Sequence, residues 1–372
     1  MKRKTKHRVF IVFAFLIIAA LYGRYNFTGD RDKFVSIITI AGDGNVPALL
    51  AKMKEPQHIK NPLIKIAYWR FKSKIEARFI NQEETFPNIS SNKIIHDISI
   101  FYQNYWRSEL LKTNLEERND SILYQKLSTY ILDNNLTELS KDSLIKNIAD
   151  DSELERIIQE EGFQCKTFYL NGLQDIMIWK DERTKKVQVE LPNQNIEANV
   201  IFLDEFILTG YANFASFGHS QTGGWAEKED ATLYCNSSGS TFNENSEEHQ
   251  VSLLKHESIH FLDLNKYPNL SSTDLEYRAK LVELIYCTEA TIYDRIGGFL
   301  NGASSEIRTH SHPYADYSII KNFSKVIFNS EFESDFSKWK SIETKEINKV
   351  ARELFQKSQD ELAKDKKVKN II

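Results

Sequence analysis

Cysteine, glycine and proline are all scarce in this chain of 372 residues. Its three cysteines, Cys165, Cys235 and Cys287, are too few for a disulfide scaffold, and the absence of a C-x-x-C pair argues against a thiolate zinc site. With 14 glycines and 7 prolines, the chain is neither collagen-like, linker-rich nor a turn-dense all-β protein. Hydrophobic residues make up 41% of the chain, which is enough to bury a sizeable globular core.

Basic charge is also in short supply outside the N-terminus. Residues 1–25 hold six basic side chains and no acidic one, which leaves 42 basic against 52 acidic side chains in the remainder, a net charge of −10. A body this acidic is not expected to bind nucleic acid, because phosphate backbones are bound by an excess of Lys and Arg.

The N-terminal residues have the order of a targeting segment. Residues 1–8 are basic, and residues 9–22 (VFIVFAFLIIAALY) carry no charge. This order is typical of a secretory signal, although a span of the bilayer needs roughly 20 apolar residues. We therefore expect an exported protein, with residues 1–23 a signal peptide or signal anchor. The body would be secreted, periplasmic or held outside the cytoplasm by residues 9–22, the only membrane contact expected.

Patterning along the rest of the chain predicts the α+β class. We expect a helical region, then short strands near residues 166–170, 175–179, 186–191 and 198–203, and helices again after residue 246. The predicted turns between the strands are Asn171-Gly172, Asp181-Glu182-Arg183 and Pro192-Asn193. The expected segments are a tether at 24–44, a helical region of unknown role at 45–162, a catalytic region at 163–330 and a C-terminal helical tail at 331–372.

The segment that carries chemistry is His256-Glu257-Ser258-Ile259-His260, an H-E-x-x-H motif. On a helix, positions i and i+4 share one face, so His256 and His260 can offer two imidazole nitrogens to one Zn²⁺ ion. Glu257 is then placed as the general base that takes a proton from the attacking water. The alternative is a surface helix with two incidental histidines.

A catalytic zinc ion needs a third protein ligand, and a second predicted helix supplies carboxylates. Glu276-Tyr277-Arg278-Ala279 follows His260 by sixteen residues. Here the chain resembles the gluzincin class of zinc metallopeptidases, whose relatives include thermolysin, over about residues 200–320. The resemblance implies a zincin-like fold with Glu276 as third ligand. Glu283 is the runner-up, and Thr273 and Glu276 also fit a helix capping box.

The resemblance leaves the orienting carboxylate open, because Lys280 stands where gluzincins often have Asp. Asp263, three residues after His260, is either that carboxylate or a surface residue.

Two further segments fit the expected site. Gly223, Gly224 and Trp225 precede a predicted strand, and they are either a substrate-binding edge or a glycine turn. Farther on, His310, His312 and Tyr314 are candidates to stabilise an oxyanion, or they belong to a loop that leads into a helix.

Together these patterns predict an exported zinc-dependent metallopeptidase with one zinc ion and a peptide or protein substrate. The alternative is a zinc-binding but non-peptidase, envelope-associated interaction module. Glu257 favours catalysis, because a purely structural zinc site needs no such carboxylate. Substrate specificity, exo- versus endopeptidase action, latency and oligomeric state leave no trace in the sequence.

Overall fold

The computed structural model describes residues 27, 29–86, 89–150, 152–227, 232–238, 242–364 and 370–372. The predicted targeting segment at residues 1–23 lies outside these residues. Within the described ranges, no helix is both long enough and apolar enough to cross a membrane.

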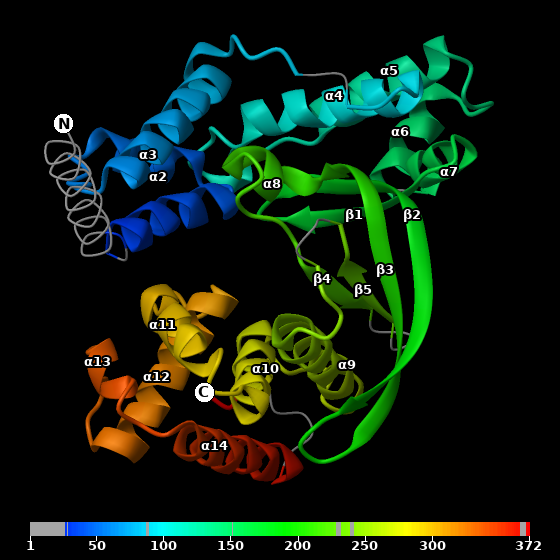
Figure 1. The fold of residues 1–372 in the computed structure, drawn as a ribbon. Helices are drawn as coiled ribbons and strands as arrows, with labels where there is room; N and C mark the ends of the chain where they lie inside the picture. The colour runs from blue at the N-terminus through cyan, green and yellow to red at the C-terminus, as the bar shows by residue number, and fades with distance from the viewer. Residues whose placement is uncertain are drawn as a thin grey trace, which may run out of the picture. The chain divides into compact units, whose positions relative to one another are not determined.

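The fold is of the α+β class, as the sequence predicted (Figure 1). Residues 29–42 are helical. The first group of elements is α2 (Val46–Lys54), α3 (Pro62–Ile75), η1 (Glu76–Asn81), α4 (Lys93–Glu109), η2 (Leu115–Glu117), α5 (Ser121–Asp133), α6 (Lys141–Ala149), α7 (Ser152–Glu160), β1 (Gln164–Leu170), β2 (Leu173–Glu190) and β3 (Asn195–Thr209). The second group is α8 (Gly210–Ser216), β4 (Gly224–Glu227), β5 (Thr232–Asn236), η3 (Glu248–Lys255), α9 (His256–Lys266), α10 (Ser272–Tyr286), α11 (Ile292–Gly302), α12 (Ser311–Phe328), α13 (Phe336–Trp339) and α14 (Thr344–Lys364).

The five strands are hydrogen-bonded in the order β1-β2-β3-β5-β4. The sheet is mixed, because β3 and β5 are parallel whereas β1 with β2 and β4 with β5 are antiparallel. This order places β4 at one edge of the sheet.

The chain divides into two compact units. Unit 1 comprises Met1–Asp181 and Glu205–Thr222, and unit 2 comprises Glu182–Asp204 and Gly223–Ile372. The sequence placed a boundary at residue 163, where helical patterning gives way to strands. The structure instead divides the chain within β2 and β3, because these two long strands run through both units.

Unit 1 contains one correction to the sequence-based organisation. The segment predicted as a tether at residues 24–44 is helical from residue 29 to 42, with Ile37 and Ala41 fully buried in the core of the unit. Most of its polar residues lie on the exposed face of the helix, and they made the segment look like a linker; Asp30 is buried. The side-chain oxygens of Asn45 and Asn61 cap the N-termini of α2 and α3.

The strand region contains a second correction. Asn171 and Gly172 have positive φ angles of 52° and 70° and form the two-residue turn between β1 and β2, as predicted. Residues 181–183, in contrast, lie inside β2. Their charged side chains are exposed to solvent along a strand that is hydrogen-bonded to its neighbour. The charged run that was predicted as a turn is therefore part of a strand.

Unit 2 is organised around α10. This helix packs against α9, α12 and α14, and nearly all of its residues from Thr273 to Ile285 are buried. Charged side chains on so enclosed a helix must find partners, since an unpaired buried charge is costly. Glu276, Arg278, Lys280 and Glu283 all lie on α10, and their partners define the site.

Candidate metal centre

Helix α9 begins at the first histidine of the motif. His256 and His260 lie one turn apart on the same side of α9, with ring centroids 4.8 Å apart. Their Nε2 atoms approach to 3.1 Å. His256 is buried, and the adjacent Ile259 packs into the core of unit 2, so burial of this face turns the histidines toward α10.

Glu276 of α10 completes a cluster with the two histidines. One carboxylate oxygen lies 3.4 Å from His260 Nε2, and the other lies 3.5 Å from His256 Nε2. One donor atom from each residue can be chosen so that all three lie within 4.8 Å of one another, which makes the trio a possible metal site.

The capping-box interpretation of Glu276 does not fit the structure. The N-cap of α10 is Ser271, whose hydroxyl accepts a hydrogen bond from the backbone of Asp274. Thr273 donates its hydroxyl proton to the carbonyl of Arg308 at 2.6 Å. Glu276 therefore points at the histidines and not at its own helix terminus.

The spacing of the donor atoms fits zinc. Four ligands at about 2.0–2.1 Å in a tetrahedron lie about 3.3 Å from one another. The two Nε2 atoms are 3.1 Å apart and Glu276 Oε1 lies 3.4 Å from His260 Nε2, both close to that value, and one donor atom from each of the three residues fits within 4.8 Å.

The protonation chemistry of the cluster also calls for a cation. Glu283 Oε1 lies 2.7 Å from His256 Nδ1, so it can accept the Nδ1 proton; once the Nε2 proton is displaced by a metal ion, Nε2 offers its lone pair. The Glu276 Oε2 atom is buried and, among the described residues, has no hydrogen bond of acceptable geometry. The converging acceptors therefore need a positive charge among them, which is either a proton on His256 or a bound cation.

The pKa values of His256 and Glu276 also indicate that the cluster favours a positive charge. Burial disfavours its charged form, but the hydrogen bonds with Glu276 and Glu283 outweigh burial and raise the pKa of His256 to about 10. Burial raises the pKa of Glu276, but His256, His260 and His312 together hold it well below its usual range. The two carboxylates, Glu276 and Glu283, thus favour a positive charge at this position.

Glu283, the runner-up for the third metal ligand in the sequence analysis, does not lie at the Nε2 side of the cluster. It is hydrogen-bonded to the Nδ1 atom of His256, on the side of the ring away from the cluster, and its second oxygen lies 3.4 Å from Arg295 Nε. A carboxylate on the far nitrogen of a metal-binding histidine sets the tautomer and the ring orientation. The structure therefore gives the orienting position to Glu283.

Asp263, proposed from sequence as that carboxylate, is buried and paired elsewhere. Its two oxygens accept hydrogen bonds from Arg278 Nε at 2.6 Å and Arg278 Nη2 at 3.0 Å. It is neither a surface residue nor the partner of a motif histidine. This bidentate pair joins α9 to α10 near His260 and Glu276, so it holds the two helices that carry the cluster in register.

The remaining motif residue, Glu257, is half-buried. Within the described ranges its carboxylate has no hydrogen-bond or ion-pair partner. It is therefore available to a ligand or a water molecule.

Among the three candidates near residue 312, the structure brings only His312 to the cluster. Its Nδ1 atom lies 3.1 Å from Glu276 Oε2, while 64% of its side chain is exposed. His310 is exposed at the N-cap of α12, and it makes no hydrogen bond to the cluster in the described part of the chain.

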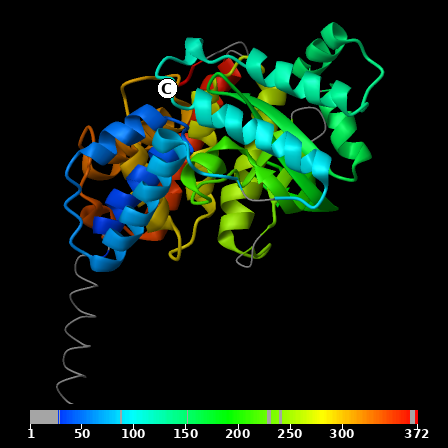
Figure 2. The ribbon, with the colours of Figure 1, turned by 90° about the horizontal axis from the view of Figure 1, so that it is seen from above.

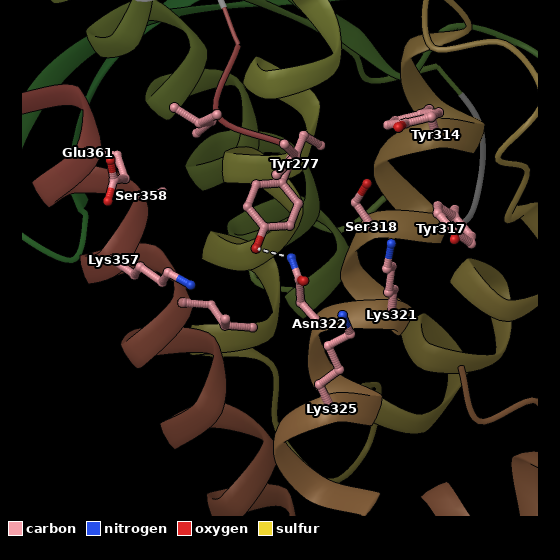
Figure 3. A pocket seen from close by; sticks show the side chains of 13 residues that line it. Tyr277, Tyr314, Tyr317, Ser318, Lys321, Asn322, Lys325, Lys357, Ser358 and Glu361 are labelled. Carbon is pink, nitrogen blue, oxygen red and sulfur yellow. Dashed lines mark hydrogen bonds between the residues drawn. The ribbon is translucent and has the colours of Figure 1, made fainter. Parts of the chain in front are cut away.

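Tyr314 lies in a different cavity (Figure 3). This cavity of about 290 Å³ is also lined by Tyr277, Lys321 and Lys357, and the Tyr277 hydroxyl accepts a hydrogen bond from Asn322 there. Because the lining includes none of the three cluster residues, the position does not support the predicted oxyanion role for Tyr314.

Gly224 and Trp225 lie in β4, the edge strand, and β4 packs against α9. A Cβ atom on Gly224 would come within 2.3 Å of the Tyr234 carbonyl oxygen, so this glycine is required by the backbone of β5. Gly223 precedes the strand, and its carbonyl accepts a hydrogen bond from Asn236. The Trp225 ring stacks on Tyr234 with centroids 4.8 Å apart.

Three residues around the cluster escaped the sequence analysis. They are the arginines Arg278 and Arg295 described above and Asp316, which forms a 2.8 Å ion pair with Lys280 and so ties α10 to the helix that carries His312. The available signal was the set of charged residues along the second predicted helix, Glu276, Arg278, Lys280 and Glu283. Their partners lie far away in sequence and could not be read from spacing.

Comparisons of the chain with protein-family models, with curated proteins and with solved structures found no match.

Proposed function

We propose that the protein is an exported zinc-dependent metallopeptidase of the gluzincin type, with a zincin-like arrangement in unit 2. The observation that carries the proposal is the convergence of His256, His260 and Glu276, with one donor atom from each within 4.8 Å of the others, together with Glu257, which follows His256 and has no partner among the described residues.

Zinc bound by these three residues would lower the pKa of water toward about 7 and polarise a substrate carbonyl. Glu257 accepts a proton from the attacking water and transfers it to the leaving amide nitrogen as the C–N bond breaks. The water oxygen becomes part of the new carboxyl group. Glu283 holds the His256 ring in place, and the exposed imidazole of His312 lies where it can donate a hydrogen bond to the oxyanion.

The position of β4 supports a peptide as substrate. An edge strand can accept an extended peptide through backbone hydrogen bonds, and β4 lies directly against the motif helix α9. Gly224 keeps that strand close to β5, with no side chain between them.

The test combines zinc content with hydrolysis of a peptide library. The parent protein should hold about one zinc ion per chain and cleave peptides. Glu257→Gln should retain zinc and lose turnover, whereas Glu276→Gln should lose zinc affinity. The exposed Glu289 is the matched control, and Glu289→Gln should change neither property.

Two results would contradict parts of this proposal. Zinc bound normally without any peptide hydrolysis would favour the non-peptidase binding module. Failure of the parent to bind zinc after reconstitution would remove the enzyme hypothesis altogether.

A further inference from the structure

Helix α3 of unit 1 exposes a row of large apolar side chains. Leu63, Ile66 and Trp69 are 70%, 50% and 53% exposed. The opposite face of the same helix buries Ile64, Tyr68, Phe71 and Ile75 in the core of the unit. The helix is therefore apolar on two faces, and the core accounts for only one of them.

Basic side chains border the exposed row on both sides. At 100° per residue, Lys65 lies on one side of Leu63, Ile66 and Trp69, Lys74 lies on the other, and Arg70 lies between Leu63 and Ile66. Helix α3 contains no acidic residue. Lys65 and Arg70 are exposed and form no ion pair with any described residue. This local positive charge stands out in a body with a net charge of −10.

An exposed apolar row with basic borders matches the surface of an anionic bilayer. Such helices lie in the membrane plane, with Leu, Ile and Trp inserted at the headgroup boundary and Lys or Arg against anionic lipid headgroups. Tryptophan in particular favours this boundary, because its ring is apolar and its N–H is polar.

The helix of residues 29–42 connects α3 to the N-terminal segment. The Asp30 carboxylate accepts hydrogen bonds from the backbone of Lys60 at 2.7 Å and Asn61 at 2.6 Å, so the start of α3 is fixed to the helix of residues 29–42. The blue helices of residues 29–42, α2 and α3 lie together in both views (Figures 1 and 2). Phe34 packs against Phe71, with ring centroids 5.7 Å apart.

Only six residues separate this helix from the apolar run at 9–22. Even fully extended, they reach about 20 Å. If residues 9–22 anchor the chain, α3 begins within reach of the bilayer.

We propose that α3 docks flat on an anionic phospholipid surface through Leu63, Ile66 and Trp69, with Lys65, Arg70 and Lys74 contacting the headgroups. This docking is independent of the metal centre. It adds a membrane contact within unit 1 to the one expected from the N-terminal segment.

The test uses the full chain with one cysteine introduced for a fluorophore. All three native cysteines are buried, so Ile66→Cys can be labelled selectively. Val326→Cys is the matched control, because Val326 is also an exposed apolar residue on a helix, with 54% exposure. Each labelled protein is reconstituted into vesicles of phosphatidylcholine alone, or of phosphatidylcholine mixed with phosphatidylglycerol.

In the anionic vesicles, the label at position 66 should shift to the blue and be quenched by brominated lipid, while the label at position 326 should remain in water. Lys65→Gln and Arg70→Gln should each lower the ratio of docked to undocked α3 by roughly fivefold.

Equal, water-like emission at both positions would overturn the proposal. So would shielding of position 66 that depends on protein concentration and not on anionic lipid, since that result assigns the face to self-association.

Discussion

Replacing Glu283 by Gln tests the geometry of the metal centre directly. Gln keeps an oxygen that can accept the proton on His256 Nδ1, but it removes the negative charge that lies 2.7 Å from this nitrogen. Zinc affinity should fall because the imidazole becomes a weaker base, while all three proposed ligand atoms remain.

The magnitude follows from the position of the carboxylate. Loss of a partner on the far nitrogen of a metal-binding histidine typically weakens metal binding 10- to 100-fold, or about 1.4–2.8 kcal/mol. Glu283→Gln should weaken zinc binding by about tenfold, because Gln preserves the hydrogen bond to His256 Nδ1. Glu283→Ala should weaken zinc binding by about a hundredfold, because Glu283 is buried and its removal also takes a carboxylate partner from Arg295.

The assay is a competition titration with a chromophoric zinc chelator at constant pH. Asp175→Asn is the control, because Asp175 is a buried carboxylate of unit 1 that accepts a hydrogen bond from the backbone of Tyr211 and has no contact with the cluster. It should bind zinc within about twofold of the parent below its unfolding temperature, since no proposed metal ligand loses its partner. Loss of zinc from Glu283→Gln as complete as from His256→Ala would refute the reasoning and make Glu283 a ligand. An unchanged affinity would refute the orienting role.

Three further predictions concern stability, measured as the free energy of unfolding in urea. Burial raises the pKa of Asp175 from 3.8 to about 7. The folded state therefore binds this proton more tightly, and the contribution of Asp175 to stability should fall by about 3 kcal/mol between pH 4 and 7 in the parent and be absent in Asp175→Asn. The opposite slope would contradict the burial argument. Gly224→Ala should cost about 1–3 kcal/mol, because the added carbon meets the Tyr234 carbonyl oxygen, and a neutral result would show that β4 can shift freely. Asp263→Asn should cost about 3–5 kcal/mol by leaving Arg278 buried without its counter-charge, and a cost below about 1 kcal/mol would exclude the clamp between α9 and α10.

Local spacing was sufficient for the parts of the protein that depend on regular backbone geometry. The i and i+4 positions of His256 and His260 share a helix face whatever the rest of the chain does, and Asn171-Gly172 favours a two-residue turn by its own φ preferences. The α+β class followed from periodicity in the same way. Predictions from local composition were wrong where exposed polar residues in a helix or strand resembled a loop. This happened in the helix at 29–42 and in the charged middle of β2.

The roles of the carboxylates were decided only by tertiary packing. Glu276 and Glu283 lie two turns apart on one face of α10, so spacing alone allowed either to approach the histidines. The crossing of α9 and α10, held by Asp263 and Arg278, brings Glu276 to the Nε2 atoms and Glu283 to Nδ1 of His256. The sequence by itself determined which residues can bind a metal. The tertiary structure decided which of them meet, because contacts between helices depend on side chains distant along the chain.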